Sequence, residues 1–153
     1  VNAYPQVQQQ LLTANAREKN GFYAVHSTVP PFRNLTSNKI FGLVEFIMIK
    51  DDSCKECYDV TVNKQILQRF GMYLAKEKTL DVSSAEGKAL LQKYNITAVP
   101  MILVSPEASV YPIFVNAWDD VGSVEKDGWY VMRGPEIVGT VKDLKTNQIL
   151  QGG

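Results

Sequence analysis

The sequence contains few cysteines for a protein of its length. Of its 153 residues, only two are cysteine. A chain of this length with 45% hydrophobic residues can bury an apolar core without disulfide crosslinks. The composition therefore excludes a disulfide-dependent miniprotein and predicts one compact domain.

The sequence also lacks an excess of either charge and any long apolar run. Sixteen Lys and Arg residues balance sixteen Asp and Glu residues, so the formal net charge is +0. Such a chain has no positive field to attract a nucleic acid or an anionic membrane surface, and we expect neither as a partner. No run of about 18 apolar residues is present, so no segment is expected to span a bilayer. Because the chain opens at Val1, a removed signal peptide or membrane anchor stays compatible with the sequence.

The hydrophobic pattern predicts alternating strands and helices. The segment "IFGLVEFIMI", residues 40–49, is a nearly unbroken apolar run, as expected for a strand buried on both faces of a sheet. The alternation that follows indicates an α/β fold. The further predicted elements are a helix at 54–70, a strand at 72–82, a helix at 83–96 capped by Ser83 or Ser84 with Glu86 in a capping box, a strand at 101–105, a short helix at 111–122, a strand at 128–133 and a hairpin at 137–150 that turns near Thr146 and Asn147.

Residues 1–40 are predicted to form an N-terminal extension. Residues 5–19 have apolar side chains at roughly helical spacing, and residues 21–28 have the aromatic and β-branched content of a strand. We expect this helix and strand to pack on the domain formed by residues 41–153.

An insertion at about residues 106–127, together with the strand after it, is rich in aromatic residues. These side chains could form an apolar surface for a client protein or could belong to the core. Core packing is the more common fate of large aromatic side chains in a folded domain, and we expect it here. The residues concerned are Tyr111, Phe114, Trp118 and Trp129.

Both cysteines, Cys54 and Cys57, lie in the segment "DDSCKEC". At the first turn of a helix capped by Ser53 or Asp52, this spacing would put both side chains on one face, within reach of a disulfide. The helix N-terminus would stabilise a thiolate at Cys54 and lower its pKa from about 8.5 to about 3.5–7.5. We therefore predict Cys54 as the nucleophile and Cys57 as the resolving thiol.

The cysteine pair alone leaves two other interpretations open. A purely structural disulfide would close a very small loop and would constrain the unfolded chain little. A structural metal site would need about four ligands, whereas the sequence offers the two thiols, His26 and carboxylates such as Asp51 and Asp52. The position of the motif after a buried strand favours a redox pair.

The chain resembles the thioredoxin-like superfamily of thiol-disulfide oxidoreductases. The resemblance rests on the "LVEF" strand, on "CKEC" at the expected start of a helix, and on "TLDVSSAEGKALLQKYNITAVPMILVS". It covers about residues 41–105, with a pairing strand at 128–133. It implies a three-layer α/β/α sandwich around a mixed central sheet, here with an N-terminal extension and a modified C-terminal part.

The resemblance also implies roles for residues outside the cysteine pair. In that family the proline that matches Pro100 is cis, and the residue before it, here Val99, offers backbone groups to an extended substrate peptide. A buried acid in the central strand often moves a proton for the second cysteine. Glu45 would be that proton relay if the loop before Cys54 is longer than usual.

Charged residues around the motif leave the redox direction open. Lys55 lies directly after Cys54 and favours a thiolate, whereas Glu56 opposes it, so both are candidates for tuning the thiol pKa. The pair between the cysteines also lacks the proline or glycine of familiar redox members. The sequence therefore does not distinguish an oxidant from a reductant or an isomerase.

From this sequence we expect a thiol-disulfide oxidoreductase that acts on protein thiols or disulfides through Cys54 and Cys57, without a dissociable cofactor or metal. The alternatives are a redox-silent thioredoxin-like module that binds a partner protein, and a metal-handling domain that uses both thiols. Because both cysteines lie in the motif and the chain does not begin with Met, we expect an exported or membrane-tethered location.

Overall fold

The computed structural model describes residues 9–10, 13, 16–19, 22–25 and 29–153. Its centre is a five-stranded mixed sheet with the strand order β6-β5-β8-β10-β9. Within this sheet β5 and β6 are parallel, and the other neighbours are antiparallel. The strands are β5 (Val44–Lys50), β6 (Leu74–Asp81), β8 (Met101–Val104), β9 (Gly122–Val124) and β10 (Tyr130–Met132).

Strand β5 is an inner strand, as its apolar sequence predicts. It is paired with β6 on one edge and with β8 on the other, and the side chains of Val44, Phe46 and Ile49 are all 0% exposed. The predicted strand at 40–49 is interrupted at Gly42, where the backbone takes a φ of +84°. Only a glycine adopts this conformation without strain, so the two residues before it form the separate strand β4 (Ile40–Phe41).

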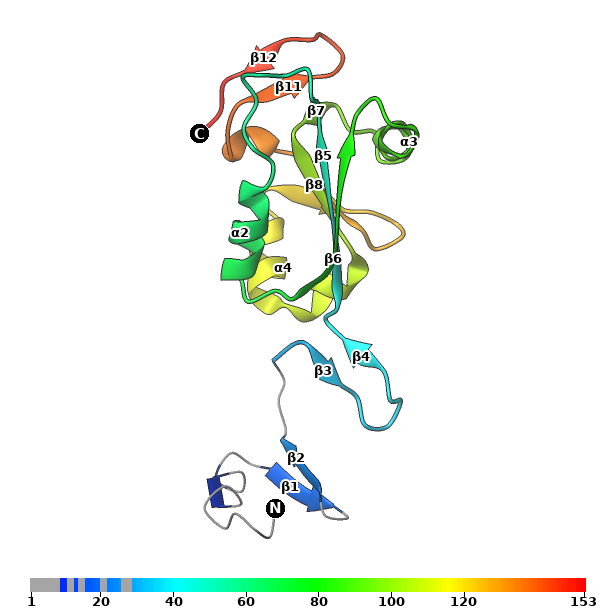
Figure 1. The fold of residues 1–153 in the computed structure, drawn as a ribbon, viewed down its shortest axis with the longest axis vertical. Helices are drawn as coiled ribbons and strands as arrows, with labels where there is room; N and C mark the ends of the chain where they lie inside the picture. The colour runs from blue at the N-terminus through cyan, green and yellow to red at the C-terminus, as the bar shows by residue number, and fades with distance from the viewer. Residues whose placement is uncertain (1–8, 11–12, 14–15, 20–21, 26–28) are drawn as a thin grey trace.

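Three helices cover the sheet. They are α2 (Val62–Arg69), α3 (Ala85–Lys93) and α4 (Pro112–Trp118). Figure 1 shows α2 and α4 on one side of the sheet and α3 on the other. The prediction of an α/β fold is thus confirmed as a mixed sheet with helices. Two short 3-10 turns, Pro106–Val110 and Pro135–Ile137, connect the remaining elements.

The start of α3 confirms the predicted Ser84 cap but not the predicted capping box with Glu86. Ser84 is the N-cap, and its Oγ accepts a hydrogen bond of 3.0 Å from the amide of Gly87. A capping box from Ser84 would need an acid at the position of Gly87. Glu86 lies one residue earlier, and its carboxylate instead binds the Nζ of Lys78 on β6. The predicted capping box is therefore wrong.

Three of the four aromatic residues expected in the core, Tyr111, Phe114 and Trp118, are buried, and Trp129 is half-buried against the core. Phe114 is 0% exposed, and its ring centroid lies 4.9 Å from that of Trp118 and 5.0 Å from that of Tyr130. Tyr111 is also buried, and its hydroxyl donates a hydrogen bond of 2.6 Å to the carbonyl oxygen of Gly42. The insertion therefore closes one end of the core.

A second, three-stranded sheet lies beside the first. Its strand order is β12-β11-β7, with antiparallel pairs throughout. The hairpin of β11 and β12 confirms the predicted turn, because Asn147 has the φ of +58° that tight hairpin turns require. The strands are β7 (Ala98–Val99), β11 (Val141–Asp143) and β12 (Ile149–Leu150).

The N-terminal part contains two small hairpins. Strands β1 (Ala16–Lys19) and β2 (Phe22–Val25) pair with each other, and β3 (Phe32–Arg33) pairs with β4. Of the helix predicted at 5–19, residues 9, 10 and 13 are helical, as predicted, and the last four residues form β1, so the predicted end is wrong; the other residues lie outside the described part of the chain. The expected packing of residues 1–40 on the domain stays a prediction.

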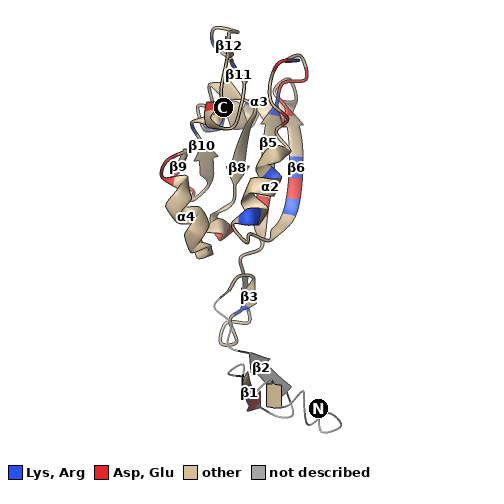
Figure 2. Ribbon diagram, turned by 90° about the vertical axis from the view of Figure 1, so that its left-hand side faces the viewer, with Lys and Arg blue, Asp and Glu red and all other residues tan. Residues whose placement is uncertain are grey.

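The surface of the molecule carries interspersed charges. Figure 2 shows Lys and Arg next to Asp and Glu, most clearly along β6, where Lys76, Glu77 and Lys78 are consecutive and exposed. This distribution fits the balanced composition. In the part of the chain that the structure describes, no helix is both long enough and apolar enough to cross a bilayer.

Candidate redox site

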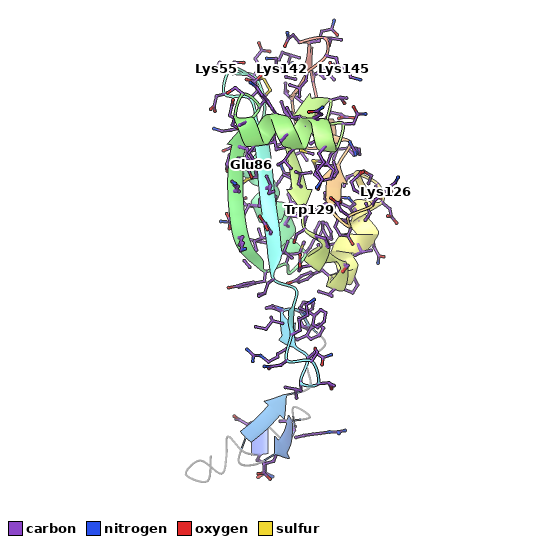
Figure 3. All side chains as sticks on the ribbon, turned by 90° about the vertical axis from the view of Figure 1, so that its right-hand side faces the viewer. Lys55, Glu86, Lys126, Trp129, Lys142 and Lys145 are labelled. Carbon is purple, nitrogen blue, oxygen red and sulfur yellow. A yellow bond between two sulfur atoms is a disulfide. The ribbon has the colours of Figure 1, made fainter. Side chains whose placement is uncertain are left out.

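Cys54 and Cys57 form a disulfide in the loop between β5 and α2. Their Sγ atoms are 2.03 Å apart and their Cα atoms 5.5 Å apart. Both residues are half-buried, so the sulfur atoms lie at the boundary between the core and solvent. In Figure 3 the disulfide lies near the end of the molecule where Lys55, Lys142 and Lys145 are labelled.

The disulfide does not lie at a helix N-terminus, and this corrects the sequence prediction. Helix α2 begins only at Val62, with Thr61 as its N-cap and without a side-chain capping bond. The predicted caps, Ser53 and Asp52, therefore do not cap α2. Without a helix start at Cys54, the argument for a thiolate stabilised by the helix dipole does not apply, because that effect is confined to the first turn.

Local hydrogen bonds explain why the chain turns at the cysteines instead of forming a helix. The carboxylate of Asp51 accepts a hydrogen bond of 2.8 Å from the amide of Ser53, and the amide of Cys54 donates to the carbonyl oxygen of Asp51 at 3.0 Å. Asp59 accepts in the same way from the amide of Thr61 at 2.9 Å. Aspartate side chains that bind nearby amides stabilise turns in competition with helices.

The other wall of the site is β7. The Sγ atom of Cys57 lies 3.8 Å from the carbonyl oxygen of Val99, and both Val99 and Pro100 are buried. The peptide bond between Val99 and Pro100 is cis. The structure therefore brings together four of the residues that the sequence singles out: Cys54, Cys57, Val99 and Pro100.

The backbone of Val99 is already paired within the chain. Val99 lies opposite Lys142 in the antiparallel ladder between β7 and β11, and the amide of Leu144 donates to the carbonyl oxygen of Thr97 at 2.8 Å. The amide of Tyr58, next to Cys57, donates to the carbonyl oxygen of Thr140 at 2.9 Å. The pairing position at Val99 that we expected a client to use is thus occupied by β11.

A partly buried ion pair joins β11 to the cysteine loop. The Nζ of Lys142 lies 2.7 Å from Oδ2 of Asp51, and the two side chains are only 18% and 8% exposed. This hydrogen bond, with a second from Ser53, lowers the pKa of Asp51 from its ordinary 3.8 to about 2. Asp51 is therefore ionised at neutral pH, and its charge is matched by Lys142.

Tyr58 connects the cysteine loop to Pro100 and to α2 through its hydroxyl group. Its hydroxyl donates to the carbonyl oxygen of Pro100 at 3.3 Å and accepts a hydrogen bond of 2.9 Å from Nδ2 of Asn63. Burial raises the pKa of Tyr58 to about 12, so the phenol stays protonated and able to donate. This bond ties the cysteine loop and α2 to the proline that follows β7.

The two charged residues between the cysteines face solvent. Lys55 and Glu56 are exposed, and the Nζ of Lys55 donates to the carbonyl oxygen of Asp52 at 3.0 Å. The side chain of Asp52 pairs with Lys50 at 2.6 Å. Charge tuning of the thiols by Lys55 and Glu56 stays a prediction.

Glu45 does not lie beside the cysteines. It is at the start of β5, whereas the cysteine loop follows the end of that strand at Lys50. Five residues of extended strand span about 16 Å at about 3.3 Å per residue. At this distance Glu45 cannot exchange a proton directly with Cys57. Asp51, by contrast, belongs to the turn before Cys54, where its carbonyl oxygen accepts from the amide of Cys54.

Metal ligands do not gather around the two cysteines. Within the described part of the chain, no three His, Cys, Asp or Glu residues are grouped closely enough to hold a metal ion. His26, which the sequence offers as a ligand, lies outside the described residues.

Sequence reasoning missed Lys142, Thr140 and Tyr58 as residues of this site. The first two come from a hairpin far along the chain, and nothing in an alternating strand pattern marks one lysine as buried. Tyr58 had a weak signal, because it directly follows Cys57.

A comparison of the chain with models of protein families, with curated proteins and with solved structures finds no match.

Proposed function

We propose that this chain is a thioredoxin-like thiol-disulfide oxidoreductase that exchanges disulfides with protein thiols. The observation that carries the proposal is the Cys54–Cys57 disulfide at the end of an inner strand, with Cys57 3.8 Å from the carbonyl oxygen of Val99. The layered arrangement of helices on both sides of the sheet supports the thioredoxin-like class.

The chemistry needs only the two cysteines and a partner with two thiols. A partner thiolate attacks Sγ of Cys54, the Cys54–Cys57 bond breaks, and the Cys57 thiolate takes a proton. A second partner thiolate then attacks the mixed disulfide, which leaves the partner oxidised and both cysteines reduced. The reverse sequence oxidises a partner. Cys57 contacts the carbonyl oxygen of Val99, and this supports Cys54 as the sulfur that meets the partner.

The surroundings of Cys54 support a reductant more than a strong oxidant. A strongly acidic thiol makes a disulfide oxidising. No helix N-terminus stands behind Cys54, so the helix dipole does not stabilise a thiolate there. We therefore expect the reduction potential of the Cys54–Cys57 pair to lie nearer to that of the reductants in this family than to that of the oxidants.

The mixed disulfide is the intermediate that tests this proposal. In the variant Cys57→Ser, a thiol partner attached to Cys54 has no internal thiol to release it, so the mixed disulfide should accumulate. The matched variant Cys54→Ser should trap much less, because Cys57 contacts the carbonyl oxygen of Val99. Both are measured by mass spectrometry after incubation with a cysteine-containing protein disulfide. Failure of both variants to trap a partner would contradict the proposal.

A further inference from the structure

The hairpin of β11 and β12 is attached to both walls of the redox site. On one side β11 pairs with β7, with Lys142 opposite Val99. On the other side the carbonyl oxygen of Thr140 accepts from the amide of Tyr58, and the side chain of Lys142 binds Asp51. The segment from residue 140 to residue 144 therefore bridges the cysteine loop and the strand beside it.

The position of β11 is the one that an extended client would need. Paired strands lie about 4.8 Å apart, so a segment paired with β7 at Val99 runs alongside the sulfur of Cys57. Adding a strand to a sheet edge is also a general way to bind an extended peptide through its backbone. In this structure the chain itself provides that strand.

Lys142 and Asp51 form an ion pair between this hairpin and the cysteine loop. They are the most buried ion pair among the residues that the structure describes, since every other pair has both side chains more than a quarter exposed. Burial reduces screening by water, so this pair resists opening more than the exposed pairs do.

The hairpin is nevertheless built to be separable from the main fold. It belongs to the small three-stranded sheet, not to the five-stranded one. Strand β12 has two residues, and Leu150 at its end is 40% exposed, whereas Val141 of β11 is 0% exposed, so departure of the hairpin uncovers one buried apolar side chain. Elements with few buried apolar contacts open locally at lower cost than core strands.

We propose that the β11–β12 hairpin is a resident strand that occupies the client position along Val99, held there by the ion pair between Lys142 and Asp51. This inference rests on the proposed oxidoreductase function and adds a regulation of the same site. An extended protein client exchanges with Cys54 only after β11 has left β7. A small dithiol reaches the sulfur atoms while the hairpin stays in place.

The test compares an extended and a small reductant on the intact chain. One probe is an unstructured peptide of about ten residues with two cysteines, and the other is dithiothreitol; each supplies two thiols, ends as a disulfide and leaves Cys54 and Cys57 reduced. The variant D51N/K142M removes both charges, so that no buried charge is left unpaired. We expect the ratio of the peptide rate to the dithiothreitol rate to rise about tenfold, because the open state becomes more populated.

Two further variants control this experiment. K78M/E86Q removes an exposed ion pair on β6 and α3, and it should leave the ratio unchanged. N147V strains the hairpin turn at a φ of +58° without touching the ion pair, and it should raise the ratio by a smaller factor. An unchanged ratio in both D51N/K142M and N147V would overturn the proposal.

Amide hydrogen exchange keeps this proposal separate from the proposed function. The amide of Leu144 donates to Thr97 across the β7–β11 ladder, so its exchange reports departure of the hairpin. Failure of dithiothreitol to reduce wild type would count against the oxidoreductase function and against access of a small dithiol, but not against occupation of the client position by β11. A peptide with both cysteines replaced by serine then tests the resident strand: faster exchange at Leu144 supports displacement, and unchanged exchange overturns it.

Discussion

The α4 end of the molecule and the cysteine end are held by different kinds of contact. Around α4, buried aromatic rings pack directly on each other, with Phe114 in contact with Trp118 and Tyr130. Around the cysteines, the connections are hydrogen bonds and one partly buried ion pair, from Tyr58 to Pro100 and from Lys142 to Asp51. Apolar packing is non-directional and contributes most of the stability, whereas polar contacts fix positions at a smaller net gain. The two ends should therefore respond differently to substitution.

The largest loss in the free energy of unfolding is expected from a substitution at the α4 end. Phe114→Ala removes a fully buried ring and leaves a cavity, which should lower the free energy of unfolding by about 3–5 kcal/mol in a urea titration. The fraction of oxidised cysteine pair in a fixed redox buffer should not change. Ile113→Ala on the same helix is the matched control, because Ile113 is 63% exposed and its loss should cost less than about 0.5 kcal/mol. A change in the redox equilibrium of the Phe114 variant would show that the two ends are not separate.

The second-largest loss in the free energy of unfolding is expected when the ion pair between Lys142 and Asp51 is removed, and this loss should depend on pH. The pKa of Asp51 is lowered to about 2 from an ordinary 3.8, mainly by Lys142. A depressed carboxyl pKa stabilises the fold above about pH 4, and this contribution is lost as the pH falls from about 4 to about 2. Lys142→Met should therefore cost about 1–2 kcal/mol at pH 7 and much less near pH 2, where about half of the Asp51 carboxyl is protonated.

The exposed Lys145 on the same hairpin provides the control for this measurement. Lys145→Met should leave the free energy of unfolding nearly unchanged at every pH, because its side chain is exposed. If the loss in the Lys142 variant were equally large at pH 2 and pH 7, the ion pair would not be its cause.

The smallest loss in the free energy of unfolding is expected from a substitution of Tyr58. Tyr58→Phe keeps the ring and removes the hydroxyl that donates to Pro100 and accepts from Asn63. We expect a loss of about 1 kcal/mol in the free energy of unfolding, the usual net value of a hydrogen bond. Tyr73→Phe, at a residue that is 53% exposed, should have no measurable effect. Equal losses at both positions would show that the polar contacts of Tyr58 contribute nothing of their own.

The sequence predicted those parts of the fold that a local pattern determines. The apolar run of β5, the Ser84 cap of α3 and the turn of the β11–β12 hairpin were all expected, because periodicity, capping and turn chemistry act over a few residues. The prediction of a helix start at the cysteines was wrong, since the same aspartate can cap a helix or close a turn, and only tertiary contacts decide between the two.

The contacts that complete the site could not be predicted from the sequence. Asp51 and Lys142 are 91 positions apart, and neither residue type nor spacing indicates that they meet. The pairing of β11 with β7 likewise follows from the three-dimensional fold, because a strand pattern does not name its partner. The sequence thus singled out Cys54 and Cys57, which the structure joins in a disulfide, and the structure added the residues that surround them.

The measurement that tests the central claim most directly is an equilibrium redox titration of the chain against dithiothreitol buffers, with alkylation and mass readout of Cys54 and Cys57. We predict a reversible two-electron couple with a potential nearer to about −270 mV than to about −120 mV. A cysteine pair that neither opens nor closes over the range of buffers would contradict the proposed function.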